Sequence, residues 1–180
     1  MNLATKLHTI ADIDALPEGT RAELIDGIIN DMSAPSLIHQ DIVAELTTIF
    51  RNYIRSHKGS CRAFPSPIAV YLNQDDYNYV EPDISIICDP KKLNDKGCLG
   101  APDFIAEVVS PASKRMDYLI KLFKYRSVGV REYWIINPEK RIVSVYSWIE
   151  GHESADMYSF GDEIPSGIYP DLKIRLADVV

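Results

Sequence analysis

The stretch DFIAEVVSPASKRMDYLIKLFKY, residues 103–125, joins a very apolar segment to a segment with helical spacing. The apolar part, from Phe104 to Val109, predicts a strand in the middle of a sheet, where both faces are covered. Glu107 interrupts this strand with an ionisable side chain. A buried carboxylate is costly unless a metal ion, a lysine or a hydrogen-bonded network compensates it. The stretch therefore predicts a central strand that carries a partnered acid.

The second half of this stretch predicts a helix over residues 113–128, ended by Gly129. A regular helix advances about 100° per residue, which places Lys121 on one line with Asp117 and Tyr125. On this period alone, that line would face solvent. The stripe expected to face the core consists of Met116, Leu119, Ile120 and Phe123.

Outward from this unit, the sequence alternates between strand and helix patterns. The segment RAELIDGIINDM predicts a hairpin with its turn at Asp26–Gly27. The other predicted elements are helices over residues 9–16 and 36–57 and strands over 66–72, 79–88, 131–138 and 141–148. We therefore expect one α/β (α+β) domain over residues 1–180, a mixed sheet flanked by helices, with an N-terminal hairpin and extra C-terminal strands.

Length and composition are those of an ordinary globular protein. The chain has 180 residues, 46% hydrophobic and 25% charged. No apolar run approaches the roughly 20 residues of a membrane span. Asp12 and Asp14 interrupt the segment where a signal peptide would have its apolar core. We expect a cytoplasmic protein without a membrane partner.

The net charge of -7 argues against a general nucleic-acid binder, because Lys and Arg make most phosphate contacts. Residues 113–131 differ from the rest of the chain, since Asp117 is their only acid among several lysines and arginines. This basic segment is either a solvated helix face or a surface that meets phosphate. Motifs of the GxGxxG, GxxxxGK[ST] and GxSxG types are absent, which removes the usual sequence support for nucleotide binding and serine hydrolysis.

The three cysteines are Cys61, Cys88 and Cys98, and no two of them form a CxxC pair. An odd count without paired spacing argues against a disulfide framework and against a thiolate zinc site. We expect three reduced structural thiols.

Asp83 and Glu107 share one feature, because each is the only acid between apolar strand residues in PDISIIC and DFIAEVVS. Alternation places Asp83 on the same face as Ser85, and Glu107 on the same face as Val109. If the two strands are neighbours, the carboxylates converge at one edge of the sheet. Two close carboxylates repel unless a cation lies between them, and hard oxygen ligands with room for water suit Mg²⁺ or Mn²⁺. The alternative is that Asp83 ends a loop and Glu107 pairs with a base.

The PD of YVEPDISII, followed by Glu107 in IAEVVS, resembles the PD-(D/E)XK nuclease pattern. The phrases LPEGTRAELIDGIINDMS, EPDISII and DFIAEVVSPASKRMDYLIKLFKYRSVGVREYWIINP, with His39 between them, resemble the Uma-two family, formerly a domain of unknown function. The resemblance runs from about Leu16 to at least Tyr146. It implies a restriction-endonuclease-like core with a mixed sheet between helices.

The resemblance maps Asp83 and Glu107 onto the two acidic metal ligands. The superfamily pattern has lysine two residues after the second acid, where this chain has Val109. In the Uma-two pattern, the lysine lies in the following helix, which matches Lys121. Lys124 is the alternative, because its angle on the helix lies closer to the expected apolar stripe.

Glu23 and His39 match two further positions of the family pattern. Glu23 would complete the metal shell or tune Lys121, and His39 would contact phosphate or orient a neighbouring group. The Val108 carbonyl would add a metal ligand. For both Glu23 and His39, a purely structural role is an equal alternative.

The function implied is a Mg²⁺- or Mn²⁺-dependent endonuclease acting on DNA. The absence of lysine at position 109 and the acidic net charge favour a second hypothesis, a nuclease-like fold that binds nucleic acid or protein without cleaving. Hydrolysis of another phosphoester is a third. A homodimer through the aromatic C-terminal strands follows only by analogy with enzymes that cut both strands.

Overall fold

A computed structural model describes residues 7–111 and 113–180 of the chain. In chain order its elements are α1 (Ile10–Asp14), β1 (Ala22–Ile25), β2 (Ile28–Asp31), α2 (Leu37–Ser56), β3 (Arg62–Pro65), β4 (Val70–Tyr71), β5 (Ile84–Ile87), η1 (Pro90–Lys92), β6 (Leu93–Asn94), β7 (Gly97–Leu99), β8 (Phe104–Val108), η2 (Met116–Lys121), α3 (Leu122–Val128), β9 (Glu132–Asn137), β10 (Ile142–Ser147), β11 (Ser154–Ser159), β12 (Ile164–Pro165), β13 (Lys173–Ile174) and η3 (Leu176–Asp178).

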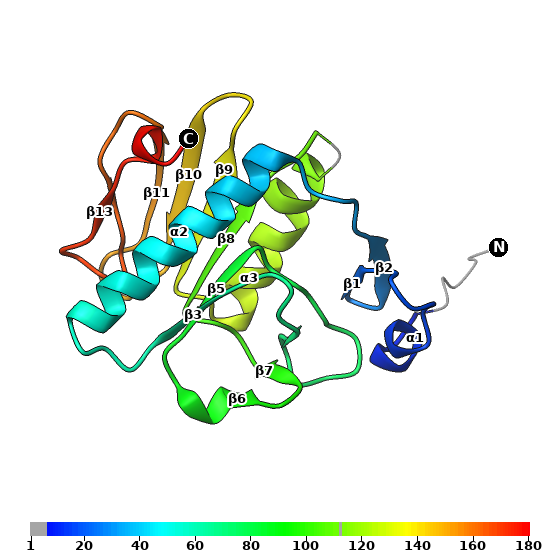
Figure 1. Cartoon of the computed structure of the whole chain (residues 1–180). Helices are drawn as coiled ribbons and strands as arrows, with labels where there is room; N and C mark the ends of the chain where they lie inside the picture. The colour runs from blue at the N-terminus through cyan, green and yellow to red at the C-terminus, as the bar shows by residue number, and fades with distance from the viewer. Residues whose placement is uncertain (1–6, 112) are drawn as a thin grey trace.

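The main sheet has six strands in the order β11-β10-β9-β8-β5-β3 (Figure 1). Strands β8 and β9 are parallel, and the other neighbouring pairs are antiparallel. Strand β8 lies inside the sheet and all five of its residues are buried, as its apolar sequence predicts. The expected mixed sheet flanked by helices is confirmed.

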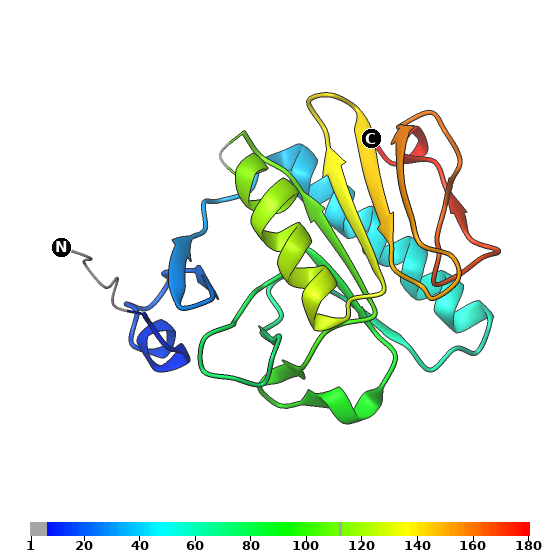
Figure 2. The ribbon, with the colours of Figure 1, turned by 180° about the vertical axis from the view of Figure 1, so that it is seen from behind.

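Helices cover both faces of this sheet. The long helix α2 crosses one face in Figure 1, and the helix formed by η2 and α3 lies on the opposite face in Figure 2. Alternation along β8 divides its side chains between the two layers. Phe104 and Ala106 pack in the core that includes Leu46 and Phe50 of α2, whereas Ile105 packs with residues of the other face. Glu107 therefore points toward η2 and α3.

The N-terminal hairpin is also confirmed. Strands β1 and β2 are joined by Asp26 and Gly27, whose φ angles of 50° and 76° are those of a tight two-residue hairpin turn. A bridge between Leu24 and Tyr79 attaches the hairpin to the segment that precedes β5. This attachment places β1 beside the candidate site.

The strand predictions differ from the structure in two ways, because two strands are shorter than expected and others were not predicted. The strand expected over residues 79–88 forms only as β5. Of the strand expected over residues 66–72, only β4 forms, and it belongs to a separate small sheet with β7 and β6. Neither of those two strands was predicted, and neither was β3. Strands of two to four residues are too short to show a periodic pattern, which explains these errors.

The prediction of three reduced thiols is wrong for two of them. Cys61 and Cys88 form a disulfide, whereas Cys98 is a buried free thiol. Cys61 directly precedes β3 and Cys88 directly follows β5, and Arg62 faces Ile87 in the ladder between these strands. The two cysteines are the next pair along the ladder. Their separation of 27 residues hides this relation in the sequence, since β3 itself was not recognised.

Within residues 7–111 and 113–180, no helix combines the length and the apolar character needed to cross a membrane.

Candidate active site

Asp83 and Glu107 face one another across neighbouring strands. The antiparallel register pairs Ile84 with Ala106, which makes Asp83 and Glu107 the next pair toward the end of the ladder. The Asp83 backbone N–H donates to Glu107 Oε2 at 3.3 Å, and the Val108 N–H donates to Asp83 Oδ2 at 2.8 Å. The predicted convergence of the two carboxylates is therefore what the fold produces.

Lys121 reaches these acids from the helix that follows β8. Its Nζ lies 2.9 Å from Glu107 Oε1, 2.8 Å from Glu23 Oε2 and 3.8 Å from Asp117 Oδ1. The Lys121 side chain is only 6% exposed. Lys124, the alternative candidate, instead pairs with Asp26 at the hairpin turn and does not line the cavity. The geometry thus places Lys121, not Lys124, beside the acids.

The predicted orientation of this helix was wrong. Asp117, Lys121 and Tyr125 are buried, whereas three residues of the expected core stripe are exposed: Leu119 (52%), Ile120 (40%) and Phe123 (68%). Residues Met116–Lys121 form a π-helix, in which hydrogen bonds run from i to i+5 and the turn holds an extra residue. The line of Asp117, Lys121 and Tyr125 thus forms as the regular spacing predicts, but it faces the protein interior instead of solvent. Short π-helical segments occur frequently at functional sites.

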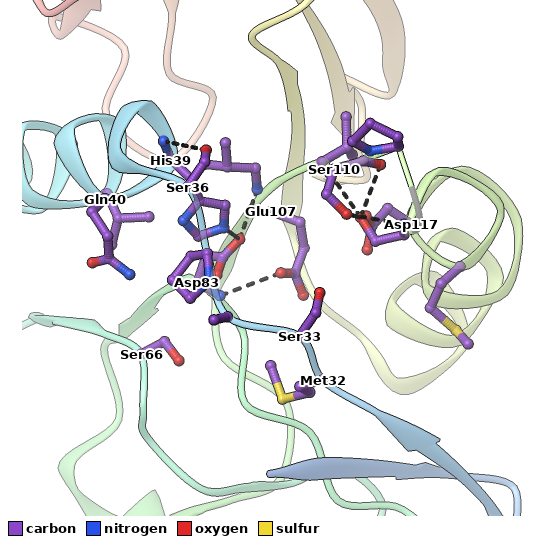
Figure 3. A pocket seen from close by; sticks show the side chains of 18 of the residues that line it. Met32, Ser33, Ser36, His39, Gln40, Ser66, Asp83, Glu107, Ser110 and Asp117 are labelled. Atoms are coloured by element: carbon purple, nitrogen blue, oxygen red, sulfur yellow. Dashed lines mark hydrogen bonds and ion pairs between the residues drawn. The ribbon is translucent and has the colours of Figure 1, made fainter.

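Glu23 contacts Lys121, and His39 contacts Asp83. Glu23, on β1, accepts a hydrogen bond at Oε1 from the Glu81 backbone N–H (3.1 Å) and from Lys121 (3.0 Å). His39 lies in the first turn of α2, which Ser36 caps, and its Nε2 is 3.0 Å from Asp83 Oδ2. Figure 3 shows His39 above Asp83, with Glu107 on the other side. The His39 Nδ1 is buried and has no hydrogen-bond partner among the described residues.

Tyr125 and Asp117 are neighbours whose contacts the sequence did not reveal. The Tyr125 hydroxyl donates to Glu107 Oε1 at 2.8 Å and is fully buried. Asp117 is 2% exposed, and its backbone carbonyl accepts from the Tyr133 hydroxyl at 3.2 Å. The spacing of four residues between Asp117, Lys121 and Tyr125 was the available signal, but it does not show which way the line faces.

Three carboxylates, those of Glu107, Glu23 and Asp117, therefore surround the Lys121 ammonium group, and Asp83 lies beside Glu107. Burial raises the pKa of Glu107 well above its usual value; Lys121 opposes this shift, and Asp83, Asp117 and Glu23 add to it. Burial alone would lower the pKa of Lys121, but Glu107, Glu23 and Asp117 together raise it well above its usual range. Burial also raises the pKa of Asp117, although Lys121 and Ser113 oppose the shift. Lys121 thus keeps its proton, and a further cation beside Glu107 would favour the ionised form of this carboxyl group.

The acids line a cavity of about 890 Å³, whose wall is shown in Figure 3. Within the described residues, no group of three or more His, Cys, Asp or Glu side chains is arranged to hold a metal ion. The donor set nevertheless fits a hard cation, since Mg²⁺ commonly binds one or two carboxylates and keeps several waters. Asp83 Oδ1 accepts no hydrogen bond from any described residue, and Glu107 Oε2 accepts only the long one from Asp83. Val108 and Val109 also line the cavity.

The sheet, its two helical layers and the acid pair on adjacent strands define a restriction-endonuclease-like protein. A crystal structure from Anabaena variabilis, described as a "putative nuclease belonging to DUF820", has the same fold, with a TM-score of 0.76 and 20% identity. The similarity covers 95% of this chain and 96% of that one.

The particular family follows from the sequence. Residues 10–177 match the Uma2 (Uma-two) family, described as "Putative restriction endonuclease", and the chain belongs to this family. An uncharacterized protein of Synechocystis is 30% identical over 125 residues, which span 69% of this chain and 64% of that protein. The match thus spans less than two thirds of the relative's length.

Proposed function

We propose that the protein is a divalent-metal-dependent endonuclease that hydrolyses phosphodiester bonds of DNA in this cavity. The observation that carries the proposal is the meeting of Asp83, Glu107 and a protonated lysine at the end of two paired strands. Family membership supports the reaction class, and the nature of a nuclease implies a nucleic-acid substrate.

The metal ligands in this proposal are Asp83 and Glu107, with the Val108 carbonyl as a third. A Mg²⁺ or Mn²⁺ ion bound there would lower the pKa of a bound water and stabilise negative charge on the phosphate. Tyr125 and Lys121 hold Glu107 in place through its Oε1, which leaves Oε2 on the side of Asp83.

Lys121 supplies positive charge in this proposal and does not act as a base. Its raised pKa keeps the amine protonated, so it can stabilise negative charge that develops on the phosphate and orient an attacking water. Glu23 holds the amine from the hairpin side. His39 orients Asp83 through Nε2, and its unpartnered Nδ1 is available to a phosphate oxygen or a water.

The test is cleavage of supercoiled plasmid by purified protein with Mg²⁺ or Mn²⁺. We expect Asp83→Ala and Glu107→Ala each to lower the rate by at least about a thousandfold, because each removes a ligand worth several kcal/mol of charge stabilisation. Circular dichroism would verify that both variants remain folded. Equal nicking by the wild type and both variants would assign the activity to a contaminant or to another site.

A binding module without turnover is the second candidate. Val109 in the lysine position and the absence of a three-residue metal group among the described residues favour it. Tight association with DNA, with no cleavage in Mg²⁺, Mn²⁺ or Co²⁺, would be the result that selects this candidate.

The cellular compartment also remains a proposal. The sequence predicts the cytoplasm, whereas a disulfide is more typical of oxidising compartments. Thiol titration of the denatured, unreduced protein would show whether Cys61 and Cys88 form the disulfide. One reactive thiol, that of Cys98, is the result expected if Cys61 and Cys88 are joined in the cell.

A further inference from the structure

Arg21 is a rigidly held cation on the wall of the cavity. It directly precedes β1, and its Nε and Nη2 donate to Glu81 Oε2 at 2.9 and 2.6 Å. Nη2 also donates to Ser66 Oγ at 2.7 Å. Nη1 forms no hydrogen bond with any described residue, and the side chain is 38% exposed. The guanidinium group is thus fixed on one side and open on the other.

One residue, Ser66, connects the Arg21 guanidinium group to Asp83 of the acid pair. Ser66 directly follows β3, and its backbone N–H donates to the Asp83 carbonyl at 2.9 Å. Because Pro65 pairs with Ile84, Ser66 stands opposite Asp83 on the β3–β5 ladder. Figure 3 shows Ser66 on the wall of the cavity below Asp83.

Arg21 differs from the other basic residues of the cavity in its exposure to solvent. Among the described residues that line the cavity, Lys121 is buried between carboxylates and the His39 Nε2 faces Asp83. Of the two lysine and arginine side chains among these lining residues, Lys121 is buried and Arg21 is exposed to solvent. An anionic substrate that enters a cavity rich in carboxylates needs such a group to offset repulsion.

We propose that Arg21 and Ser66 form a phosphate-binding subsite for a phosphodiester group next to the one that is cut. Guanidinium groups suit phosphate because their planar N–H donors match two of its oxygens. Nη1 would donate to the phosphate, and the Ser66 hydroxyl, which accepts from Arg21, keeps its own proton to donate. Glu81 holds the guanidinium in this orientation and is itself fixed by the Tyr79 hydroxyl at 2.7 Å. The identification of the ligand as DNA rests on the proposed function.

The first measurement is the affinity for a short fluorescent DNA duplex, by anisotropy, with Ca²⁺ in place of Mg²⁺. We expect Arg21→Ala to raise the Kd about tenfold, as loss of a charge-assisted hydrogen bond predicts. The slope of log Kd against log salt should fall by about one, as for a lost phosphate contact. Arg131→Ala is the matched control. The Arg131 side chain is 48% exposed and pairs with Asp103 at a distance of 3.3 Å, and neither residue lines the cavity. The affinity of this variant should equal that of the wild type.

The second measurement uses duplexes in which a single phosphate is replaced by a neutral methylphosphonate. At the contacted position this replacement should weaken binding by the wild type and have no further effect on Arg21→Ala. The proposal would be overturned if, at every position, the methylphosphonate weakened binding by Arg21→Ala as much as binding by the wild type. It would also be overturned if Arg21→Ala bound the unmodified duplex with wild-type affinity.

A double variant separates phosphate binding from a structural role. Arg21→Ala leaves the carboxylate of Glu81 without its cationic partner, whereas Arg21→Ala/Glu81→Gln removes the negative charge of Glu81 as well. Weak binding by both variants supports the subsite. Recovery of wild-type affinity in the double variant would mean that Arg21 acts only through Glu81, and would overturn it.

The outcome can be separated from that of the proposed function, because binding is measured without turnover. If Asp83→Ala and Glu107→Ala cleave as the wild type does, the proposed function fails, and a methylphosphonate effect that depends on Arg21 would still establish the subsite. If the wild-type protein has no measurable affinity for any duplex, the subsite is wrong.

Discussion

Two buried glutamates on adjacent parallel strands differ in every contact they make. Glu107, near the carboxyl end of β8, accepts from Lys121 and Tyr125 and lies beside other carboxylates. Glu132, the first residue of β9, is completely buried and accepts only from neutral donors. These are Trp134 Nε1 at 2.7 Å, the Ile168 N–H at 2.8 Å, Ser166 Oγ at 3.3 Å and the Gly167 N–H.

The difference teaches that burial of an acid is not by itself a sign of function. Neutral donors fill the hydrogen-bonding positions of the Glu132 carboxyl group. Two of these donors, Ser166 and Ile168, follow β12, so Glu132 connects that segment to the start of β9. Glu107 instead belongs to a cluster of acids around one lysine, at the wall of a cavity. Clustered charge with an opening to solvent distinguishes the candidate site from the structural acid.

The largest contrast is expected in catalysis. Glu107→Gln should lower metal-dependent cleavage by at least about a thousandfold, because it removes a ligand charge. Glu132→Gln should change the rate by less than about threefold, since it lies outside the cavity and an amide can still accept hydrogen bonds. Initial rates of plasmid nicking at equal folded-protein concentration would measure both. A large loss in both variants would break the contrast.

The next effect concerns the stability of the charged cluster. Lys121→Met should lower the free energy of unfolding by about 3–5 kcal/mol, because it leaves buried carboxylates without their cation. Urea denaturation would measure the change. Adding Glu23→Gln to this variant should restore part of the loss, whereas no recovery would show that charge is not the cause.

A smaller loss is expected at the structural acid. Glu132→Ala should cost about 2–3 kcal/mol, because it leaves the buried indole N–H of Trp134 and a backbone N–H without acceptors. The same urea experiment applies, with Glu132→Gln as the milder control. A neutral result for Glu132→Ala would show that water or rearrangement satisfies these donors.

The smallest effect is a pH dependence. Burial raises the pKa of Glu132 above 4.5, although its hydrogen bonds oppose the shift. Between the unfolded and the folded pKa, the native state binds more protons, so this group's contribution to stability falls as pH rises through that window. The slope cannot exceed about 1.4 kcal/mol per pH unit for one proton. Urea titrations from acid to neutral pH should show a flatter profile in Glu132→Gln, and identical profiles would contradict the prediction.

The sequence predicted those parts of the fold in which local pattern and tertiary structure agree. The apolar run of β8, the Asp26–Gly27 turn and the long stripe of α2 each point to one structure. Asp83 and Glu107 could be paired in advance, because alternation along two neighbouring strands determines the face on which each side chain lies.

Features that depend on contacts between distant segments could not be predicted. The helix face that carries Lys121 turns inward, where Glu23 and Glu107 pair with the lysine, and the pattern of apolar residues does not show these contacts. The Cys61–Cys88 pair requires knowledge of β3, which is too short to recognise. Arg21 gains its significance only because the hairpin places it beside Ser66.

The most direct test of the central claim is a calorimetric titration of Mn²⁺ into the wild-type protein and into Asp83→Asn, Glu107→Gln and Glu132→Gln. We expect binding by the wild type and Glu132→Gln, and its loss in Asp83→Asn and Glu107→Gln. Equal Mn²⁺ affinity in all four proteins would contradict the claim that the paired carboxylates of β5 and β8 hold the metal ion.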